Sequence, residues 1–116
     1  MSDALFLVFS NAAGGRDEEF NKWYDEVHLP DVRAVPGIAG AQRYDLVDFT
    51  PDGVADAADA PAPAHRYLAV YDLEGTPESV FAEFSARMAD GRMNLSDTLD
   101  MATVNLAIWK PRGPRL

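Results

Sequence analysis

The chain has 116 residues, enough for one domain over 1–116 and too few for two, because domains usually contain about 100 to 150 residues. Hydrophobic residues make up 47% and charged residues 25%, a globular balance that excludes a disordered chain. A formal net charge of −9 argues against nucleic acid or an anionic membrane as the partner, because both repel an acidic surface.

The sequence contains no cysteine, which excludes a disulfide framework, a thiolate nucleophile and a thiolate metal site. The apolar stretch 4–9 follows Asp3 rather than Lys or Arg. It is shorter than the roughly 20 residues of a membrane span, and its acidic flank does not fit a signal peptide. We therefore expect a cytoplasmic protein that does not enter the membrane.

An apolar strand and an amphipathic helix are predicted for the first third of the chain. Residues 5–9 are all apolar and predict a strand buried on both faces. Acidic residues at 17–19 complement the positive end of a helix dipole. Pro30 disfavours helical geometry at the residue before it, so we expect the helix to stop there and an irregular turn to follow through 31–35. The helix should bury the apolar face formed by Phe20, Trp23, Tyr24 and Val27.

The middle of the chain predicts two strands separated by a loop. Residues 38–47 form the first strand, and 66–73 form the second, with alternating side chains on its two faces. Between them, 49–64 is rich in Asp, Ala and Pro and contains almost nothing to bury. This composition predicts a mobile acidic loop within one domain.

The last third predicts a helix and a strand. Thr76-Pro77-Glu78 is a strong helix start, with a capping hydroxyl and a proline in the first turn. Gly91 is a plausible end of this helix, and 101–109 alternates as a strand does. The buried face of the helix is expected to contain Val80, Phe81, Phe84 and Met88.

The resulting order, β-α-β-β-α-β, is that of a ferredoxin-like α+β fold, a four-stranded antiparallel sheet with two helices on one face. Such a protomer leaves the other face of its sheet bare. The first strand is nevertheless apolar on both sides, and a chain this small cannot bury both. We expect a second copy to cover the open face in a two-fold homodimer.

The segment around His28 is the most informative chemically. On a helix, Tyr24 and Asp25 precede His28 by four and three residues, so both can reach the imidazole. Imidazole titrates near pH 6.5, and a carboxylate would orient it, so the three residues are candidates for acid-base catalysis. The alternatives are structural: His28 would cap the helix end, Asp25 would be a solvated charge, and Tyr24 would belong to the core.

Other side chains are candidates for substrate binding, each with a structural alternative. Asn11 follows the first strand, where loops carry function, but asparagine also forms turns. Trp23 could line a pocket or pack in the core. Arg43, Tyr67 and Tyr71 lie on the central strands, where they could face a ligand, although Arg43 could equally pair with an acid on a neighbouring strand.

Several familiar sites are absent from the sequence. Neither the phosphate-loop nor the dinucleotide glycine pattern occurs around Gly14-Gly15. The two histidines are far apart and form no metal-binding pair, so we expect neither a metal nor a cofactor. A Gly-x-Ser-x-Gly nucleophile elbow is also missing.

One run of residues resembles a known family. Phe20-Asn21-x-Trp23-Tyr24-Asp25-x-x-His28-Leu29-Pro30-Asp31-Val32, then Val35-Pro36-Gly37 and a strand with Arg43-Tyr44, resembles the EthD-like branch of the dimeric α+β-barrel superfamily. The resemblance is best over 5–47. It implies a ferredoxin-like protomer whose sheet packs on that of its twin, with a pocket between each sheet and its helices.

The resemblance also bears on function. Members of the wider superfamily include cofactor-free monooxygenases, polyketide cyclases and muconolactone-type isomerases, and the histidine suspected of acid-base work falls on His28. The resemblance implies a small cofactor-independent enzyme that acts on an apolar oxygenated small molecule. Such an enzyme would be an isomerase, cyclase, lyase or monooxygenase. The alternative is a non-catalytic protein that binds a hydrophobic metabolite or assists a partner in a degradative pathway.

Overall fold

The computed structural model describes residues 4–49 and 62–116. Most of the loop expected at 49–64 therefore lies outside the described residues. The elements in chain order are β1 (Ala4–Ser10), η1 (Ala13–Gly15), α1 (Asp17–Trp23), η2 (Tyr24–His28), α2 (Leu29–Arg33), β2 (Ile38–Asp45), β3 (Tyr67–Leu73), α3 (Pro77–Ala89) and β4 (Asn105–Trp109).

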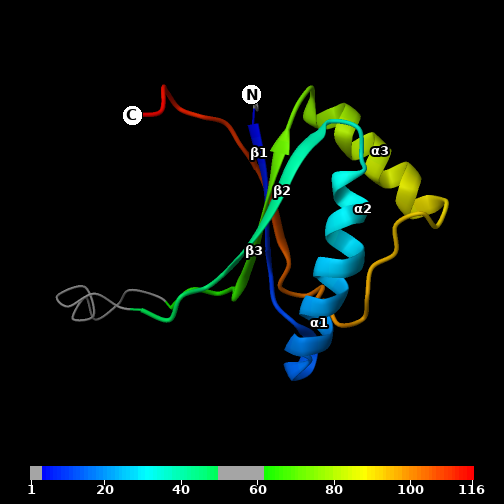
Figure 1. Cartoon of the computed structure of the whole chain (residues 1–116), viewed down its shortest axis with the longest axis vertical. Helices are drawn as coiled ribbons and strands as arrows, with labels where there is room; N and C mark the ends of the chain where they lie inside the picture. The colour runs from blue at the N-terminus through cyan, green and yellow to red at the C-terminus, as the bar shows by residue number, and fades with distance from the viewer. Residues whose placement is uncertain (1–3, 50–61) are drawn as a thin grey trace.

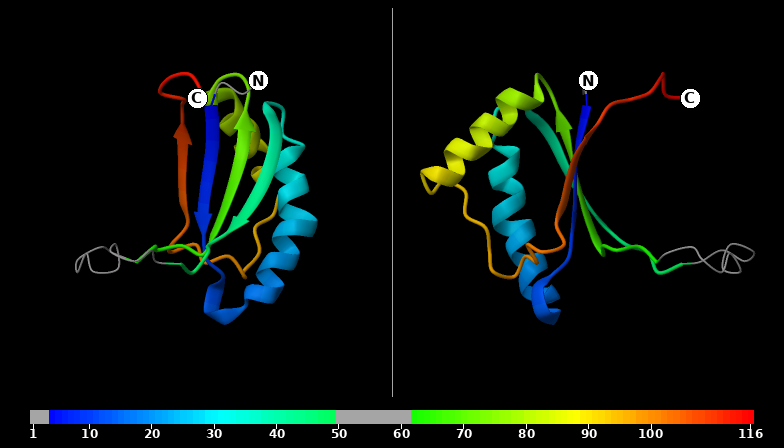
Figure 2. Two further views of the ribbon diagram at one scale, coloured as in Figure 1. Left: turned by 60° about the vertical axis from the view of Figure 1, so that its left-hand side comes forward. Right: turned by 180° about the vertical axis from the view of Figure 1, so that it is seen from behind.

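The strands of the described residues form one antiparallel sheet in the order β2-β3-β1-β4. The continuous helix of α1, η2 and α2 and the helix α3 lie on the same side of this sheet (Figure 1). The right-hand view in Figure 2 shows the same layering, with the helix of 17–33 and α3 both to the left of the sheet. The expected ferredoxin-like α+β fold is confirmed.

Alternation along the strands places one set of side chains in the core. On β1 the buried positions are Ala4, Phe6, Val8 and Ser10, and the intervening residues are half-buried. The residues that face Phe6 and Val8 across the pair with β3 are Tyr71 and Ala69, as the register requires. These side chains meet Phe20, Tyr24, Val32 and Val80 from the helices.

The first helix does not stop at Pro30, contrary to the sequence prediction. It continues to Arg33 because η2 is a π-helical turn, in which the Leu29 amide donates to the carbonyl of Tyr24, five residues earlier. The wider turn also changes which residues face the sheet. Val27, expected in the buried face, is 46% exposed, whereas Val32 is 2% exposed.

The second half of the fold contains α3 and a long connection to β4. Thr76 caps α3 as predicted, accepting a hydrogen bond from the Ser79 amide at 3.2 Å. The connection, residues 90–104, passes under the helices before entering the sheet edge (Figure 1). We call it the strap. Consequently β4 begins at Asn105 rather than at Met101, as the sequence predicted.

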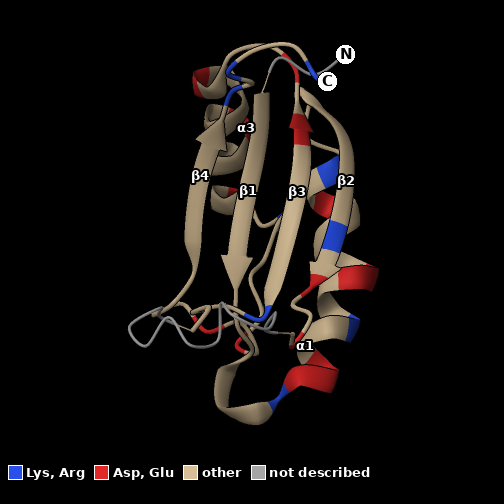
Figure 3. Cartoon of the chain, turned by 90° about the vertical axis from the view of Figure 1, so that its left-hand side faces the viewer, with Lys and Arg blue, Asp and Glu red and all other residues tan. Residues whose placement is uncertain are grey.

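The face of the sheet opposite the helices is open. Leu5, Leu7 and Phe9 point to it from β1, next to Val70 and Trp109 on neighbouring strands. In Figure 3, which looks at this face, β1 and β4 carry no charged residue. Over the ranges 4–49 and 62–116, no helix is both long enough and apolar enough to cross a membrane.

Candidate active site

A pocket of about 220 Å³ lies between the sheet and the helices. It is lined by residues of β1, β3 and β4, of the π-helical turn and α2, and of α3 and the strap. His28, Tyr24 and Tyr71 contribute its titratable groups. The remaining lining is apolar: Phe6, Val8, Val32, Phe81, Phe84, Met88, Met93, Leu95, Leu99, Met101, Val104 and Leu106.

A larger hollow of about 410 Å³ lies elsewhere, where Phe9, Tyr44 and His65 meet. Its histidine is already bonded, because the His65 Nε2 atom lies 2.6 Å from the carbonyl oxygen of Thr103. The smaller pocket is therefore the better candidate site, since its histidine has a buried nitrogen without a hydrogen-bond partner among the described residues.

His28 is fixed between aromatic rings and left without a hydrogen bond at one nitrogen. Its ring stacks on Trp23 with 4.7 Å between the centroids, and meets the edge of Tyr24 at 4.9 Å. Its Nδ1 atom is buried and has no hydrogen-bond partner among the described residues. An unpaired buried polar atom is costly, so this nitrogen is a hydrogen-bonding group that the described residues leave unused, on a side chain that lines the pocket.

The surroundings of His28 keep its imidazole neutral. Burial, and then the positive charge of Arg43, lower its pKa from the ordinary value to about 4. At neutral pH the ring therefore has one nitrogen that accepts a hydrogen bond and one that donates.

Two tyrosines place a pair of hydroxyl groups at the same pocket. The Tyr24 and Tyr71 hydroxyl oxygens are 3.2 Å apart, and both residues are 1% exposed. Burial is the first cause that raises the pKa of each hydroxyl. Both groups therefore stay protonated at neutral pH, and one hydrogen of the pair is available to an acceptor in the pocket.

Asp25 does not contact His28, contrary to the sequence expectation. Its Oδ1 atom accepts a hydrogen bond from Arg43 Nη1 at 2.8 Å, and its side chain is 60% exposed. Arg43 also donates to Asn21 Oδ1 at 2.9 Å, and its guanidinium lies 4.3 Å above the ring of Tyr24. Its Nε atom, like Nδ1 of His28, is buried without a hydrogen-bond partner among the described residues, but Arg43 does not line the pocket.

Tyr67 and Asn11 are likewise occupied outside the pocket. The Tyr67 hydroxyl donates to Asp17 Oδ2 at 2.6 Å and accepts from Asn21 Nδ2 at 3.2 Å. Asn11 donates to the Ala64 carbonyl at 3.0 Å and accepts from the Arg66 amide at 2.9 Å. These contacts give both residues a structural role in the fold.

The structure thus brings together three of the predicted site residues, His28, Tyr24 and Tyr71, with Trp23 supporting the imidazole from behind. Sequence reasoning missed the pocket wall supplied by the strap. The sequence feature that could have indicated this wall is the presence of apolar residues in an otherwise irregular segment: Met93, Leu99, Met101 and Val104. No group of three or more His, Asp or Glu residues suited to a metal ion occurs in the described part of the chain.

Comparison with solved structures gives the same fold. A candidate monooxygenase from Shewanella loihica PV-4 aligns with a TM-score of 0.59 at 16% identity, over 98% of this chain and 99% of that one. An EthD family protein from Bacillus halodurans C-125 aligns with a TM-score of 0.52 at 14% identity, over 93% and 98%. The chain has an EthD-like, ferredoxin-like fold. No protein-family profile matches the sequence, and no curated protein matches it.

Proposed function

We propose that this protein is a small cofactor-independent enzyme that carries out acid-base chemistry on an apolar, oxygenated small molecule in the pocket at His28. The observation that carries the proposal is the buried, unpartnered Nδ1 atom of His28 beside an apolar cavity. Convergence of a few polar groups in an otherwise apolar pocket is typical of sites that bind small molecules.

The size of the pocket limits what its interior can hold. About 220 Å³ is below the range of about 300 to 1,000 Å³ usual for ligand pockets. A single aromatic ring or lactone with a short substituent suits this volume. The apolar lining favours a ligand whose oxygen atoms gather at one end, next to His28 and the tyrosine pair.

The groups at the site suit removal of a proton next to a carbonyl group. Neutral His28 takes the proton from carbon, the electron pair moves onto the carbonyl oxygen, and the Tyr24–Tyr71 hydroxyl pair donates a hydrogen bond to the oxyanion that forms. The imidazolium then returns the proton to the same or another carbon. A base with a pKa of about 4 favours acidic positions, such as a carbon between two carbonyl groups.

Exchange of hydrogen for deuterium tests this chemistry directly. We expect the protein to accelerate exchange at the central carbon of 1-phenylbutane-1,3-dione in D₂O, followed by NMR. His28→Ala should lower the catalysed rate by at least about 100-fold, the lower end of the usual contribution of acid-base catalysis.

The second histidine supplies a matched control for that experiment. His65 lies at the other hollow, so His65→Ala should leave the exchange rate unchanged. Circular dichroism would verify that both variants are folded. An equal rate for wild type and His28→Ala would contradict the proposed role of His28.

The apolar lining and the neutral imidazole also favour a second function, binding of a hydrophobic metabolite without catalysis. A binding protein needs the shape of the pocket and one hydrogen-bonding group, both of which are present. This second function predicts that the diketone binds, as seen in NMR chemical shifts. It also predicts that neither the wild type nor His28→Ala exchanges the hydrogens of the diketone faster than buffer does.

We further propose that the protein forms a homodimer through the open face of its sheet. Leu7 lies on β1, between Val70 of β3 and Ala107 of β4, so it marks the apolar centre of that face. Exposed apolar surfaces of this kind commonly mark interfaces between copies.

Sedimentation equilibrium tests the homodimer. We expect the wild-type protein to have twice the protomer mass, and Leu7→Glu to reduce the measured mass to that of one protomer. Ala34→Glu, an exposed change on the helix side, is the control, and a monomeric wild type would refute the dimer.

A further inference from the structure

The pocket at His28 has its polar groups at the deep end and apolar groups at its mouth. Tyr24 and Tyr71 are each 1% exposed, and the Nδ1 atom of His28 is buried. Among the lining residues, the most exposed are Met101 at 59% and Leu106 at 55%. Polarity along the pocket therefore runs opposite to that of an ordinary protein surface, where polar groups face water.

The apolar mouth is built from three separate segments. Met88 comes from the last turn of α3, Leu95 and Met101 from the strap, and Leu106 from β4. Met88 and Leu95 are 42% and 39% exposed. We call these four residues the rim. They line one continuous pocket with His28, so the rim extends the site rather than forming a separate patch.

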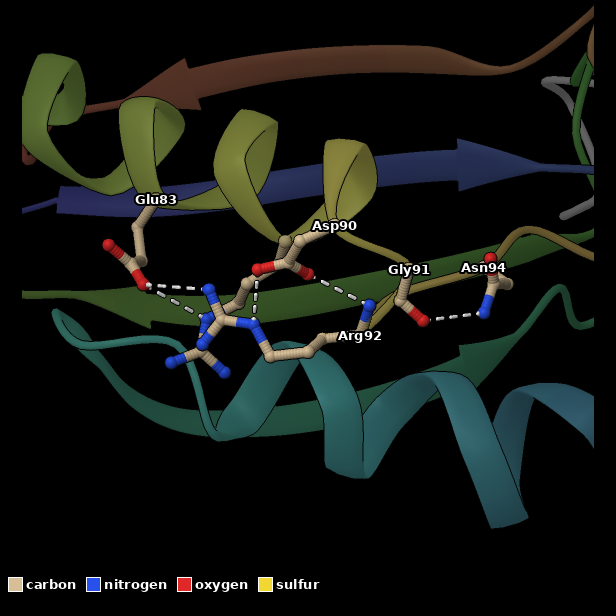
Figure 4. A network of polar contacts seen from close by, with 6 residues as sticks. Glu83, Asp90, Gly91, Arg92 and Asn94 are labelled. Atoms are coloured by element: carbon tan, nitrogen blue, oxygen red, sulfur yellow. Dashed lines mark hydrogen bonds and ion pairs between the residues drawn. The ribbon is translucent and has the colours of Figure 1, made fainter.

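Polar contacts hold the first end of the strap in place, as Figure 4 shows. Within the strap, Arg92 Nε donates to Asp90 Oδ2 at 2.7 Å, and Asn94 Nδ2 donates to the Gly91 carbonyl at 2.9 Å. Arg92 also reaches α3, where its Nη2 atom lies 4.0 Å from Glu83 Oε1. The Met93 amide reaches back to the Arg87 carbonyl at 3.1 Å. The chain next to Leu95 is thus fixed to the end of α3.

The second end of the strap is fixed to the turn after β1. The Ala13 amide donates to the Thr98 carbonyl at 2.7 Å, and the Asp100 amide donates to the Asn11 carbonyl at 3.0 Å. With both ends of the strap anchored, the rim has a defined position. A preformed apolar surface lowers the entropy cost of binding a ligand.

We propose that the ligand is an amphiphile that enters head first, with its oxygenated end at His28 and the tyrosines and an unbranched apolar tail lying along the rim. This inference rests on the proposed function, because it uses the same pocket. The interior of the pocket has room for the oxygenated end of the ligand, and the tail would cover the exposed apolar side chains of the rim. Methionine side chains are flexible and polarisable, so two of them in the rim suit tails of different length.

A series of 4-alkylphenols, from 4-methylphenol to 4-hexylphenol, tests the inference by isothermal titration calorimetry. Full burial of a methylene group corresponds to roughly fourfold in affinity. Because the rim residues are about half exposed, we expect about twofold per methylene, or about 30-fold between the ends of the series. The tail of 4-hexylphenol should also show nuclear Overhauser contacts to the Met101 methyl group, and its ring should show them to Tyr71.

Substitution of the rim supplies the second arm of the test. The double variant Met101→Gln, Leu106→Gln should reduce the 30-fold range in affinity to about fivefold, because replacing half of the apolar rim by amides halves the free-energy range. Val47→Gln is the control, since Val47 is 77% exposed but lies at the other hollow. It should leave the range unchanged.

The inference would be overturned by equal affinity along the series, by an unchanged range in the double variant, or by contacts that place the tail against Tyr71. A change of oligomeric state in the double variant would also overturn it, by showing that a second copy covers the rim. Failure here is distinct from failure of the proposed function. A flat series with intact diketone exchange refutes the tail alone, whereas a steep series without exchange refutes catalysis.

Discussion

Two sets of polar side chains meet at Tyr24, and they differ in whether they line the pocket. On one side, Arg43 bonds to Asp25 and Asn21, and Asn21 in turn bonds to Tyr67. We call this the paired set. On the other side, His28 has a buried nitrogen with no partner in the described residues, next to the Tyr24–Tyr71 hydroxyl pair. We call this the pocket set.

The difference between the two sets separates residues that support the structure around the pocket from residues that can contact a ligand in it. The carboxylate, amide and hydroxyl groups of the paired set bond to one another, and the one buried atom that they leave unpaired, Nε of Arg43, belongs to a residue that does not line the pocket. The pocket set keeps one acceptor or donor free in an apolar cavity. Residue types alone do not distinguish the two sets. Each contains a basic side chain, Arg43 or His28, together with at least one tyrosine.

The largest expected effect comes from breaking the paired set at Arg43. Arg43→Met removes charge-assisted bonds to Asn21 and Asp25 and the cation above the ring of Tyr24. We expect the free energy of unfolding to fall by about 3 kcal/mol, measured by urea denaturation. The pKa of His28 should rise but stay below 6.5, because burial is the first cause of its shift.

Arg43→Lys sharpens the same comparison. Lysine keeps the charge near His28 but lacks the fork that reaches two partners. The variant should lose less stability than Arg43→Met, and its His28 pKa, followed by NMR, should stay near the wild-type value. If both variants shifted that pKa equally, the charge of Arg43 would not be what acts on His28.

The next effect comes from the pocket set and appears as a dependence of stability on pH. The pKa of His28 is about 4 in the folded protein and near 6.5 in an unfolded chain. Between these values the unfolded state binds more protons, so stability falls as the pH falls. From pH 7 to pH 5 this loss amounts to roughly 2 kcal/mol.

His28→Phe should remove that part of the loss, because phenylalanine does not titrate. We expect the decrease in the free energy of unfolding between pH 7 and pH 5 to be smaller by roughly 2 kcal/mol in the variant. The carboxylates are common to both proteins and cancel in the difference. An identical decrease would mean that the imidazole titrates normally and is open to solvent.

The smallest effect is expected at Asp25. Its carboxylate is 60% exposed, so its ion pair with Arg43 is screened by water, and Asp25→Asn should lower the free energy of unfolding by at most about 0.5 kcal/mol. The diketone exchange rate should also change little, because Asp25 does not touch His28. A loss of exchange as large as that of His28→Ala would place Asp25 in the pocket set instead.

Much of the fold could be predicted from local patterns. The apolar run at 5–9, the alternation of Tyr67, Ala69 and Tyr71, and the Thr76 cap all describe short-range preferences that the structure keeps. The prediction failed at Pro30, where a π-helical turn allows the helix to continue, and at Val27, which that turn leaves exposed. Sequence periodicity assumes a uniform 3.6-residue turn and cannot anticipate a wider one.

The candidate site was only partly predictable, for a different reason. His28 and Tyr24 share one helix, so their proximity follows from spacing. Asp25 also has the right spacing, but Arg43 approaches from β2 and bonds to it instead, a long-range contact that sequence spacing does not show. The apolar residues of the strap have no helical or strand spacing. They line the pocket only because of the path that the chain takes from α3 back to the sheet, which sequence spacing does not show.

The wide turn before Pro30 has a consequence for how firmly the imidazole is held. Proline has no amide hydrogen, and in a regular helix its ring would press against the carbonyl of Glu26, at a cost of about 3 kcal/mol. The segment therefore has no regular α-helical form of similar energy into which it could relax when a ligand arrives. We therefore expect the backbone of His28 to keep its position relative to Tyr24, on the same π-helical turn, when a ligand binds.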